Sequence, residues 1–220
     1  MMDYSINTDA ASKSMPRSII VYGTSLSAER AAFWRRVGGQ WVTLLREWLD
    51  LNWAGEYTVV NASRWGVTSQ WGQVNLEKRV LSRNPACVIL EFTVNDADVH
   101  RAISVSQSRE NLKRMAETIH SRMPSCRIVV LLTHPCVGPY GARRPRLAEY
   151  YAACRDYARS TDLDVIDLTP VWESWMMANP DTVHDYLPDG LHPAPQASRE
   201  LIFPVVKQQL EVILMPVSDH

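Results

Sequence analysis

A serine, an aspartate and a histidine have types and neighbours suited to nucleophilic catalysis. Ser25 stands in Gly-Thr-Ser-Leu-Ser at 23–27, and Asp189 and His192 stand in Asp-Gly-Leu-His-Pro at 189–193. A serine hydroxyl is a poor nucleophile until a base takes its proton, which an imidazole can do at neutral pH. An aspartate three residues before the histidine can hold the imidazole in the required tautomer. The pattern predicts a triad that works through an acyl-enzyme.

Acyl transfer also needs hydrogen-bond donors for the oxyanion of the tetrahedral intermediate. The candidates are the backbone N–H groups of Ser25 and Gly66 and the side-chain amide of Asn95. Glycine at position 66 lets the backbone approach a substrate closely. Each catalytic interpretation has a structural alternative: Ser25 could cap a helix, and the Gly66, Asn95 and Asp189-Gly190 positions could simply form turns.

The elements that must position these residues alternate between short β-branched runs and longer stretches of helical periodicity. Strands are predicted at residues 18–22, 57–61, 86–92, 127–132 and 164–168, and helices at 28–53, 106–122, 146–160 and 196–214. Within 28–53, Trp34, Val37, Trp41 and Trp48 form an apolar stripe, and Gly38-Gly39 is expected to interrupt it. This alternation predicts an α/β fold, a parallel sheet with helices on both faces.

Three of the segments that carry the candidate residues directly follow predicted strands. They are 23–27, 61–69 and 93–96, after the first, second and third strands. In open parallel sheets, ligands bind beyond the carboxyl ends of the strands. We therefore expect Ser25, Gly66 and Asn95 to meet at one edge of the sheet.

These segments and the Asp-x-x-His turn, taken in order, resemble the sequence blocks of the SGNH (GDSL-type) hydrolase family over residues 18 to about 210. The resemblance implies a flavodoxin-like three-layer sandwich with a five-stranded parallel sheet, and hydrolysis of esters or thioesters. It makes Ser25 the nucleophile, Gly66 and Asn95 oxyanion-hole residues, and Asp189 and His192 the acid and base. The chain departs from the family at Thr24, where the motif usually has Asp, and in a long segment at 28–37.

Length and composition fit one domain. The chain has 220 residues, 46% hydrophobic and 21% charged, and we expect a flexible N-terminal segment at 1–16 and a single hydrolase domain at 17–220. A net charge of -1 predicts no nucleic-acid partner. The N-terminus lacks the apolar region of a secretory signal, and no apolar run would insert in a membrane, so we expect a cytoplasmic protein.

No cofactor or metal is predicted, because the sequence has no P-loop, no G-x-G-x-x-G, no H-E-x-x-H and no zinc-ligand spacing among its four cysteines. We expect all four cysteines to be reduced packing residues. The chain order Ser, Asp, His also occurs in α/β-hydrolases, but their G-x-S-x-G elbow is missing here.

Three further residues are candidate substrate contacts, each with a structural alternative. Trp65, with Trp71, could form a stacking wall for a sugar or belong to the core; His134 could touch substrate or be packed. Arg143, in a basic run with Arg144 and Arg146, could attract an anionic substrate or lie in a solvated loop.

The loops after the first three strands are polar and include no apolar lid, which predicts a small-molecule or carbohydrate ester as substrate, with a small acyl group such as acetyl on the sugar. A lysophospholipase or acyl-thioester hydrolase is the alternative within the same chemistry. A carbohydrate-binding module on a hydrolase scaffold is the non-enzymatic alternative, which an intact triad disfavours.

Overall fold

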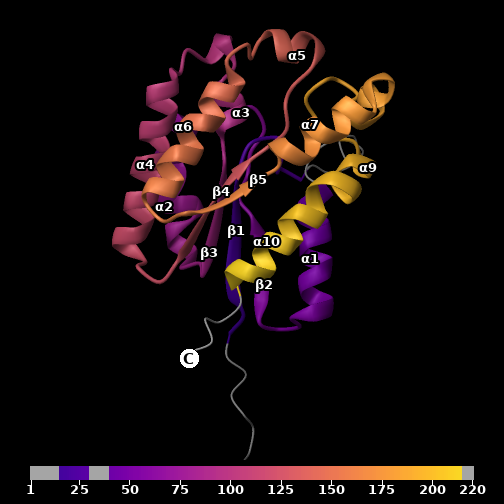
Figure 1. Cartoon of the computed structure of the whole chain (residues 1–220). Coiled ribbons are helices and arrows are strands. Elements are labelled where there is room, and N and C mark those ends of the chain that lie inside the picture. Colours follow the sequence, from indigo (N-terminus) through magenta and orange to yellow (C-terminus); the bar gives the residue numbers. More distant parts are fainter. Residues whose placement is uncertain (1–14, 30–39, 215–220) are drawn as a thin grey trace, which may run out of the picture.

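A computed structural model of the protein describes residues 15–29 and 40–214 (Figure 1). Most of the predicted N-terminal segment 1–16 lies outside these ranges. So do Trp34, Val37 and the Gly38-Gly39 pair of the predicted helix at 28–53. Inside the described part, Ala28 and Glu29 are not helical, and the helix begins only at Gln40.

Five parallel strands form one sheet in the order β2-β1-β3-β4-β5. They are β1 (Arg17–Gly23), β2 (Tyr57–Asn61), β3 (Cys87–Glu91), β4 (Arg127–Leu132) and β5 (Asp164–Asp167). Central strands covered on both faces need apolar residues at nearly every position, which is why β3 and β4 are continuous apolar runs in the sequence. The order is flavodoxin-like, with a switch point between β1 and β3, so the predicted fold is confirmed.

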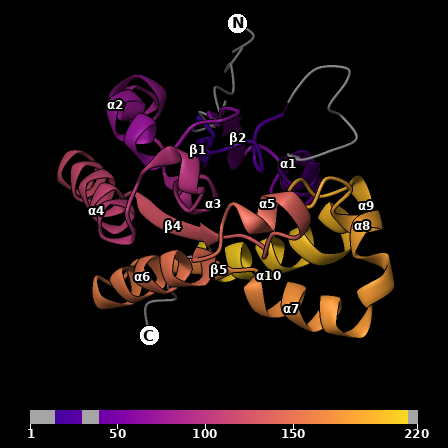
Figure 2. The ribbon, with the colours of Figure 1, turned by 90° about the horizontal axis from the view of Figure 1, so that it is seen from above.

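Helices cover both faces of the sheet (Figures 1 and 2). The larger ones are α1 (Gln40–Asn52), α2 (Ser69–Arg79), α4 (Val105–Arg122), α6 (Leu147–Ser160), α7 (Thr169–Ala178) and α10 (Phe203–Leu214). One core joins α2, α4 and α6 to Ile20 and Tyr22, and the other joins α1, α7 and α10 to Ile19 and Val21, since successive strand residues face opposite ways. Among helices in the described ranges, none is long and apolar enough to cross a membrane.

Two of the larger helices were not predicted. The helix α2 buries only Ser69, Gly72 and Leu76, so its sequence has no apolar stripe. The helix α7 follows β5 directly and has Trp172 fully buried. By contrast, Trp41 and Trp48 of the predicted stripe are buried in α1.

All four cysteines are free thiols. Cys87, Cys126 and Cys154 lie in the two cores, and Cys136 is half-buried in the loop after β4. Burial raises the pKa of Cys126 and of Cys154 to about 11. Thiols with such pKa values carry little thiolate at neutral pH, so they are packing residues, as the sequence predicted.

Candidate active site

The first part of the site is a tight turn after β1. Ser27 N–H and Ala28 N–H both donate to the carbonyl of Thr24, which folds residues 24–28 back on themselves with Ser25 at the bend. Gly23 is required just before it, because a Cβ there would lie 2.5 Å from the carbonyl oxygen of Glu91 on β3. Ser25 is 5% exposed, held at the switch point of the sheet.

Ser25, His192 and Asp189 form one hydrogen-bonded series. The Oγ of Ser25 lies 2.9 Å from Nε2 of His192, and Nδ1 of His192 lies 2.6 Å from Oδ2 of Asp189. A carboxylate only accepts, so the hydrogen on Nδ1 points to Asp189 and Nε2 is left to accept from the Ser25 hydroxyl. This is the geometry that general-base activation of a serine requires.

The turn that carries the acid and base is braced locally. The Oδ1 of Asp189 accepts from the backbone N–H groups of Leu191 and His192, at 2.9 and 2.7 Å. Gly190 has φ +86°, and a Cβ there would lie 2.4 Å from the carbonyl oxygen of Val137, whose N–H donates to Gly190. Glycine is therefore required twice, for its backbone angle and for the close approach.

Asp189 is held as a carboxylate. Burial acts to raise the pKa of Asp189, but hydrogen bonds from the His192 ring and from the N–H groups of His192 and Leu191 outweigh it and lower the pKa to about 2. A negative charge thus stands beside the imidazole throughout the neutral range, where it favours the imidazolium that forms on proton transfer.

Two aromatic rings flank His192. The Trp65 ring stacks on the imidazole, with centroids 5.1 Å apart and planes 21° from parallel. Tyr140, in the short helix α5 (Gly138–Ala142), meets the same imidazole edge-on at 6.2 Å. Trp65 therefore lies beside His192, whereas Tyr140 had no sequence signal beyond its position after β4.

The three candidate oxyanion donors lie on adjacent loops. Asn95, in α3 (Thr93–Asp96), donates through Nδ2 to the carbonyl of Val67 at 2.8 Å, which ties its loop to the Gly66 turn. Gly66 has φ +68°, a left-handed angle that favours glycine. Within the part of the chain that the structure describes, the N–H groups of Ser25 and Gly66 donate to no protein acceptor.

Asp96, next to Asn95, has a structural role. It is fully buried and accepts from Ser69 N–H at 2.8 Å and from the Ser108 hydroxyl at 2.6 Å. The first bond satisfies an N–H at the start of α2, and the second fixes the loop to α4. Asp96 thus anchors the loop that presents Asn95.

Thr24, the departure from the family motif, pairs with Glu91, for which the sequence predicted no role. The Glu91 carboxyl accepts from Thr24 N–H (3.0 Å), from the Thr24 hydroxyl (2.9 Å) and from the Ser27 hydroxyl (3.0 Å). Burial raises the pKa of Glu91, the three hydrogen bonds lower it, and because burial is the larger effect the pKa is about 7. The one sequence feature that could have pointed to Glu91 is its position as a single acidic residue at the end of the apolar run 87–91.

The other predicted substrate contacts are held by partners outside the series of Ser25, His192 and Asp189. His134 is 1% exposed and packs on Trp172, and burial lowers its pKa to about 4, so it is a neutral, packed histidine. Trp71 packs against Tyr22 in the core. Arg143 is ion-paired with Asp98 at 2.5 Å, and its guanidinium lies over the ring of Tyr140.

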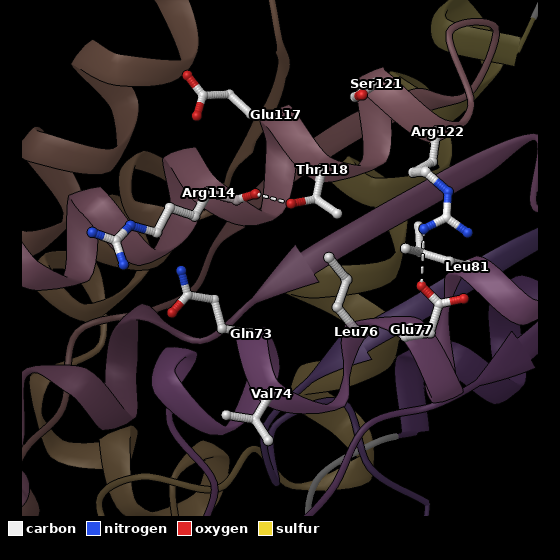
Figure 3. Close-up of a pocket in the computed structure, with 10 residues that line it drawn as sticks. All are labelled: Gln73, Val74, Leu76, Glu77, Leu81, Arg114, Glu117, Thr118, Ser121 and Arg122. Atoms are coloured by element: carbon white, nitrogen blue, oxygen red, sulfur yellow. Dashed lines mark hydrogen bonds and ion pairs between the residues drawn. The ribbon is translucent and has the colours of Figure 1, made fainter.

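A surface groove of about 760 Å³ lies away from these residues (Figure 3). It runs between α2 and α4 and is lined by mixed charges, including the Arg122–Glu77 ion pair at 3.3 Å. None of its lining residues belongs to the series formed by Ser25, His192 and Asp189, so the groove is separate from the candidate active site.

A hydroxyl, an imidazole and a carboxylate in hydrogen-bonded series, at the switch point of a flavodoxin-like sheet, are the features of a serine-type hydrolase. The sequence comparison makes the class specific: residues 20–199 match the GDSL-like lipase/acylhydrolase family, and the chain belongs to that family. It is a carboxylic ester hydrolase.

Curated relatives are named as esterases. The chain is 27% identical over 187 residues to the isoamyl acetate-hydrolyzing esterase 1 homolog of Rattus norvegicus, covering 75% of this chain and 72% of that protein. It is 30% identical over 123 residues to esterase TesA of Pseudomonas aeruginosa, covering 56% and 58%.

Solved structures agree with the fold. The lipase/acylhydrolase from Enterococcus faecalis matches with TM-score 0.70 and 26% identity, over 89% of this chain and 96% of that one. A catalytic mutant of an acetylxylan esterase from Geobacillus stearothermophilus matches with TM-score 0.75 over 89% and 94%. The second is 14% identical and shows a shared fold alone.

Proposed function

We propose that Ser25, His192 and Asp189 hydrolyse esters through an acyl-enzyme. The observation that carries this is the series of bonds from Ser25 Oγ to His192 Nε2 (2.9 Å) and from His192 Nδ1 to Asp189 (2.6 Å). Ser25 Oγ attacks the ester carbonyl carbon while its proton passes to Nε2. The imidazolium then returns that proton to the departing alkoxide, which leaves as the alcohol.

Hydrolysis of the acyl-enzyme repeats these steps with water. His192 accepts a proton from the water as it attacks the acyl carbon, and the second tetrahedral intermediate collapses by breaking the bond to Ser25 Oγ. The proton returns from His192 to Ser25, and the carboxylic acid leaves. In both halves, the N–H groups of Ser25 and Gly66 and the Asn95 amide are the donors proposed for the oxyanion.

For the substrate, we propose a small acyl group, acetyl in the first place, on a carbohydrate. Trp65 offers a flat ring beside His192, and sugar rings pack well against such faces. The name of one similar protein, an isoamyl acetate-hydrolyzing esterase 1 homolog, supports a short acyl group.

Two measurements test these proposals separately. A fluorophosphonate probe should label the wild-type protein and not Ser25→Ala, whose kcat should fall at least ~10³-fold without loss of fold. Labelling of Ser25→Ala at the wild-type rate would refute the nucleophile and leave the substrate question open.

The acyl group is tested with nitrophenyl esters of two to eight carbons. We expect the acetyl ester to exceed the octanoyl ester at least ~10-fold in kcat/KM, because long chains need a continuous apolar groove, at ~0.8 kcal/mol per buried methylene. A preference for octanoyl would favour the lysophospholipase or thioesterase alternative and leave the triad standing.

A further inference from the structure

A buried arginine lies directly behind Asn95. The basic run at 143–146 is not one surface patch: Arg146 is exposed and pairs with Glu149, whereas Arg144 is 5% exposed. Arg144 comes from the segment between α5 and α6, and its guanidinium reaches across to the loop that follows β3.

All three nitrogens of the Arg144 guanidinium are in use. Nε donates to the carbonyl of Val94 at 2.7 Å, and Nη1 donates to the carbonyl of Tyr140 at 3.2 Å. Nη2 donates to Oδ1 of Asn95 at 3.4 Å and lies 3.3 Å from Oδ2 of Asp98. A planar fork with fixed donor directions can hold this set of acceptors together, and a lysine ammonium cannot.

We propose that Arg144 is a positioning residue that fixes the orientation of the Asn95 amide. This rests on the proposed function, in which Asn95 donates to the oxyanion. The Arg144 guanidinium has only hydrogen-bond donors, so it favours the orientation in which Oδ1 of Asn95 faces it. In the flipped orientation the NH₂ group of Asn95 would face the guanidinium, and two donors would oppose each other. Nδ2 is thereby turned the other way, where one hydrogen binds Val67 and the second remains for the oxyanion.

The energetic consequence is preorganisation. An oxyanion donor is effective when it is already oriented before charge develops, so that no reorganisation accompanies the reaction. A cation on the oxygen side also polarises the amide and strengthens its N–H groups as donors in a low-dielectric site. Arg144 touches neither Ser25 nor His192 in the hydrogen-bond network, so its effect on the rate must pass through Asn95.

The test is a double-mutant cycle between Arg144→Lys and Asn95→Ala, measured as kcat and KM on nitrophenyl acetate. Alone, Arg144→Lys should lower kcat about 10-fold with KM nearly unchanged, a part of the ~10²–10³-fold expected for loss of an oxyanion donor in Asn95→Ala. In the Asn95→Ala background, Arg144→Lys should change kcat less than about 2-fold, because no amide is left to orient.

Arg144→Met removes the guanidinium charge altogether, and Arg155→Met is the matched control for it. Arg155 is also ion-paired, with Asp167 at 2.7 Å, and it donates to the Thr169 hydroxyl, but it has no contact with Asn95. Thermal unfolding of every variant measures stability directly. Arg144→Lys keeps a cation beside Asp98, which Arg143 also pairs, so the cycle remains measurable if Arg144→Met does not fold.

Three results would overturn the inference. Equal losses of kcat from Arg144→Lys in both backgrounds would mean that Arg144 acts only on the fold. An unchanged kcat in Arg144→Lys would mean that the amide needs no such partner. An unchanged kcat in Asn95→Ala would remove the oxyanion role itself, and fluorophosphonate labelling of Ser25 would show whether the rest of the proposed function survives.

Discussion

Glu91 makes the stability of the fold depend on pH in a way that one substitution can remove. The Glu91 side chain is buried beneath the tight turn at residues 24–28 and accepts hydrogen bonds from three donors of Thr24 and Ser27. Among the described residues, no cation is paired with it. Burial raises the pKa of Glu91 from its ordinary 4.5 to about 7. The folded protein therefore holds a proton on Glu91 at pH values where the unfolded chain has lost it.

The size of the effect follows from the two pKa values. The stabilisation is fully present below pH 4.5 and is lost as the pH rises through 7, because the proton then leaves the folded protein as well. One pKa unit corresponds to 1.36 kcal/mol, so between about pH 4.5 and pH 8.5 the wild type should lose about 3 kcal/mol through this group. Glu91→Gln cannot ionise and should not share that loss.

Urea unfolding of wild type and Glu91→Gln at pH 4.5 and pH 8.5 measures this difference. The stability of the variant relative to wild type should rise by about 3 kcal/mol from the lower to the higher pH, whatever its offset from the altered hydrogen bonds. Glu173→Gln, on the exposed surface of α7, is the control and should follow the wild type at both pH values. A relative stability of Glu91→Gln that is the same at both pH values would refute the reasoning.

Further variants test the triad turn and the aromatic wall. Asp189→Asn should lower kcat on the order of 10⁴-fold through the wrong imidazole tautomer, with an unchanged circular-dichroism spectrum; a loss under ~10-fold would contradict the role of the carboxylate. Gly190→Ala should lower kcat and the melting temperature together, since it meets both a left-handed φ and the Val137 carbonyl; Gly55→Ala, also at positive φ but with open space around it, should leave kcat unchanged, and an equal loss there would contradict the close-contact argument. Trp65→Ala should reduce kcat/KM for an acetylated sugar more than for nitrophenyl acetate, and equal losses would mean that the ring only supports His192.

The sequence predicted the strands and the grouping of Ser25, His192 and Asp189 because each segment involved is a local pattern, and a simple topology places these segments. Buried parallel strands must be apolar along their length, and their carboxyl ends must meet at one edge, so Ser25 and Asn95 could be brought together without coordinates. The Asp-x-x-His turn needs only three residues to place Asp189 beside His192.

What the sequence did not reveal depends on partners far along the chain. The proposed role of Arg144 depends on hydrogen-bond acceptors about 50 positions away, at Val94 and Asn95. A run of arginines in the sequence gives no sign that one of them is buried. Glu91 similarly depends on Thr24, 67 positions earlier. Helix α2 escaped prediction because two of its three buried residues, Ser69 and Gly72, are small or polar and leave no periodic apolar signal beside Leu76.

The nucleophile and its base are separated by 167 positions, and Asp189 and His192 follow the last strand of the sheet. During folding, a chain that has formed all five strands therefore contains Ser25 but not yet its base. Ser25 becomes activated only when the segment beyond β5, which carries His192, docks against Val137. Reactivity toward a fluorophosphonate during refolding should then report the arrival of that final segment rather than the formation of the sheet. Stopped-flow labelling followed beside far-ultraviolet circular dichroism would separate the two events in time, with the chemical signal appearing second.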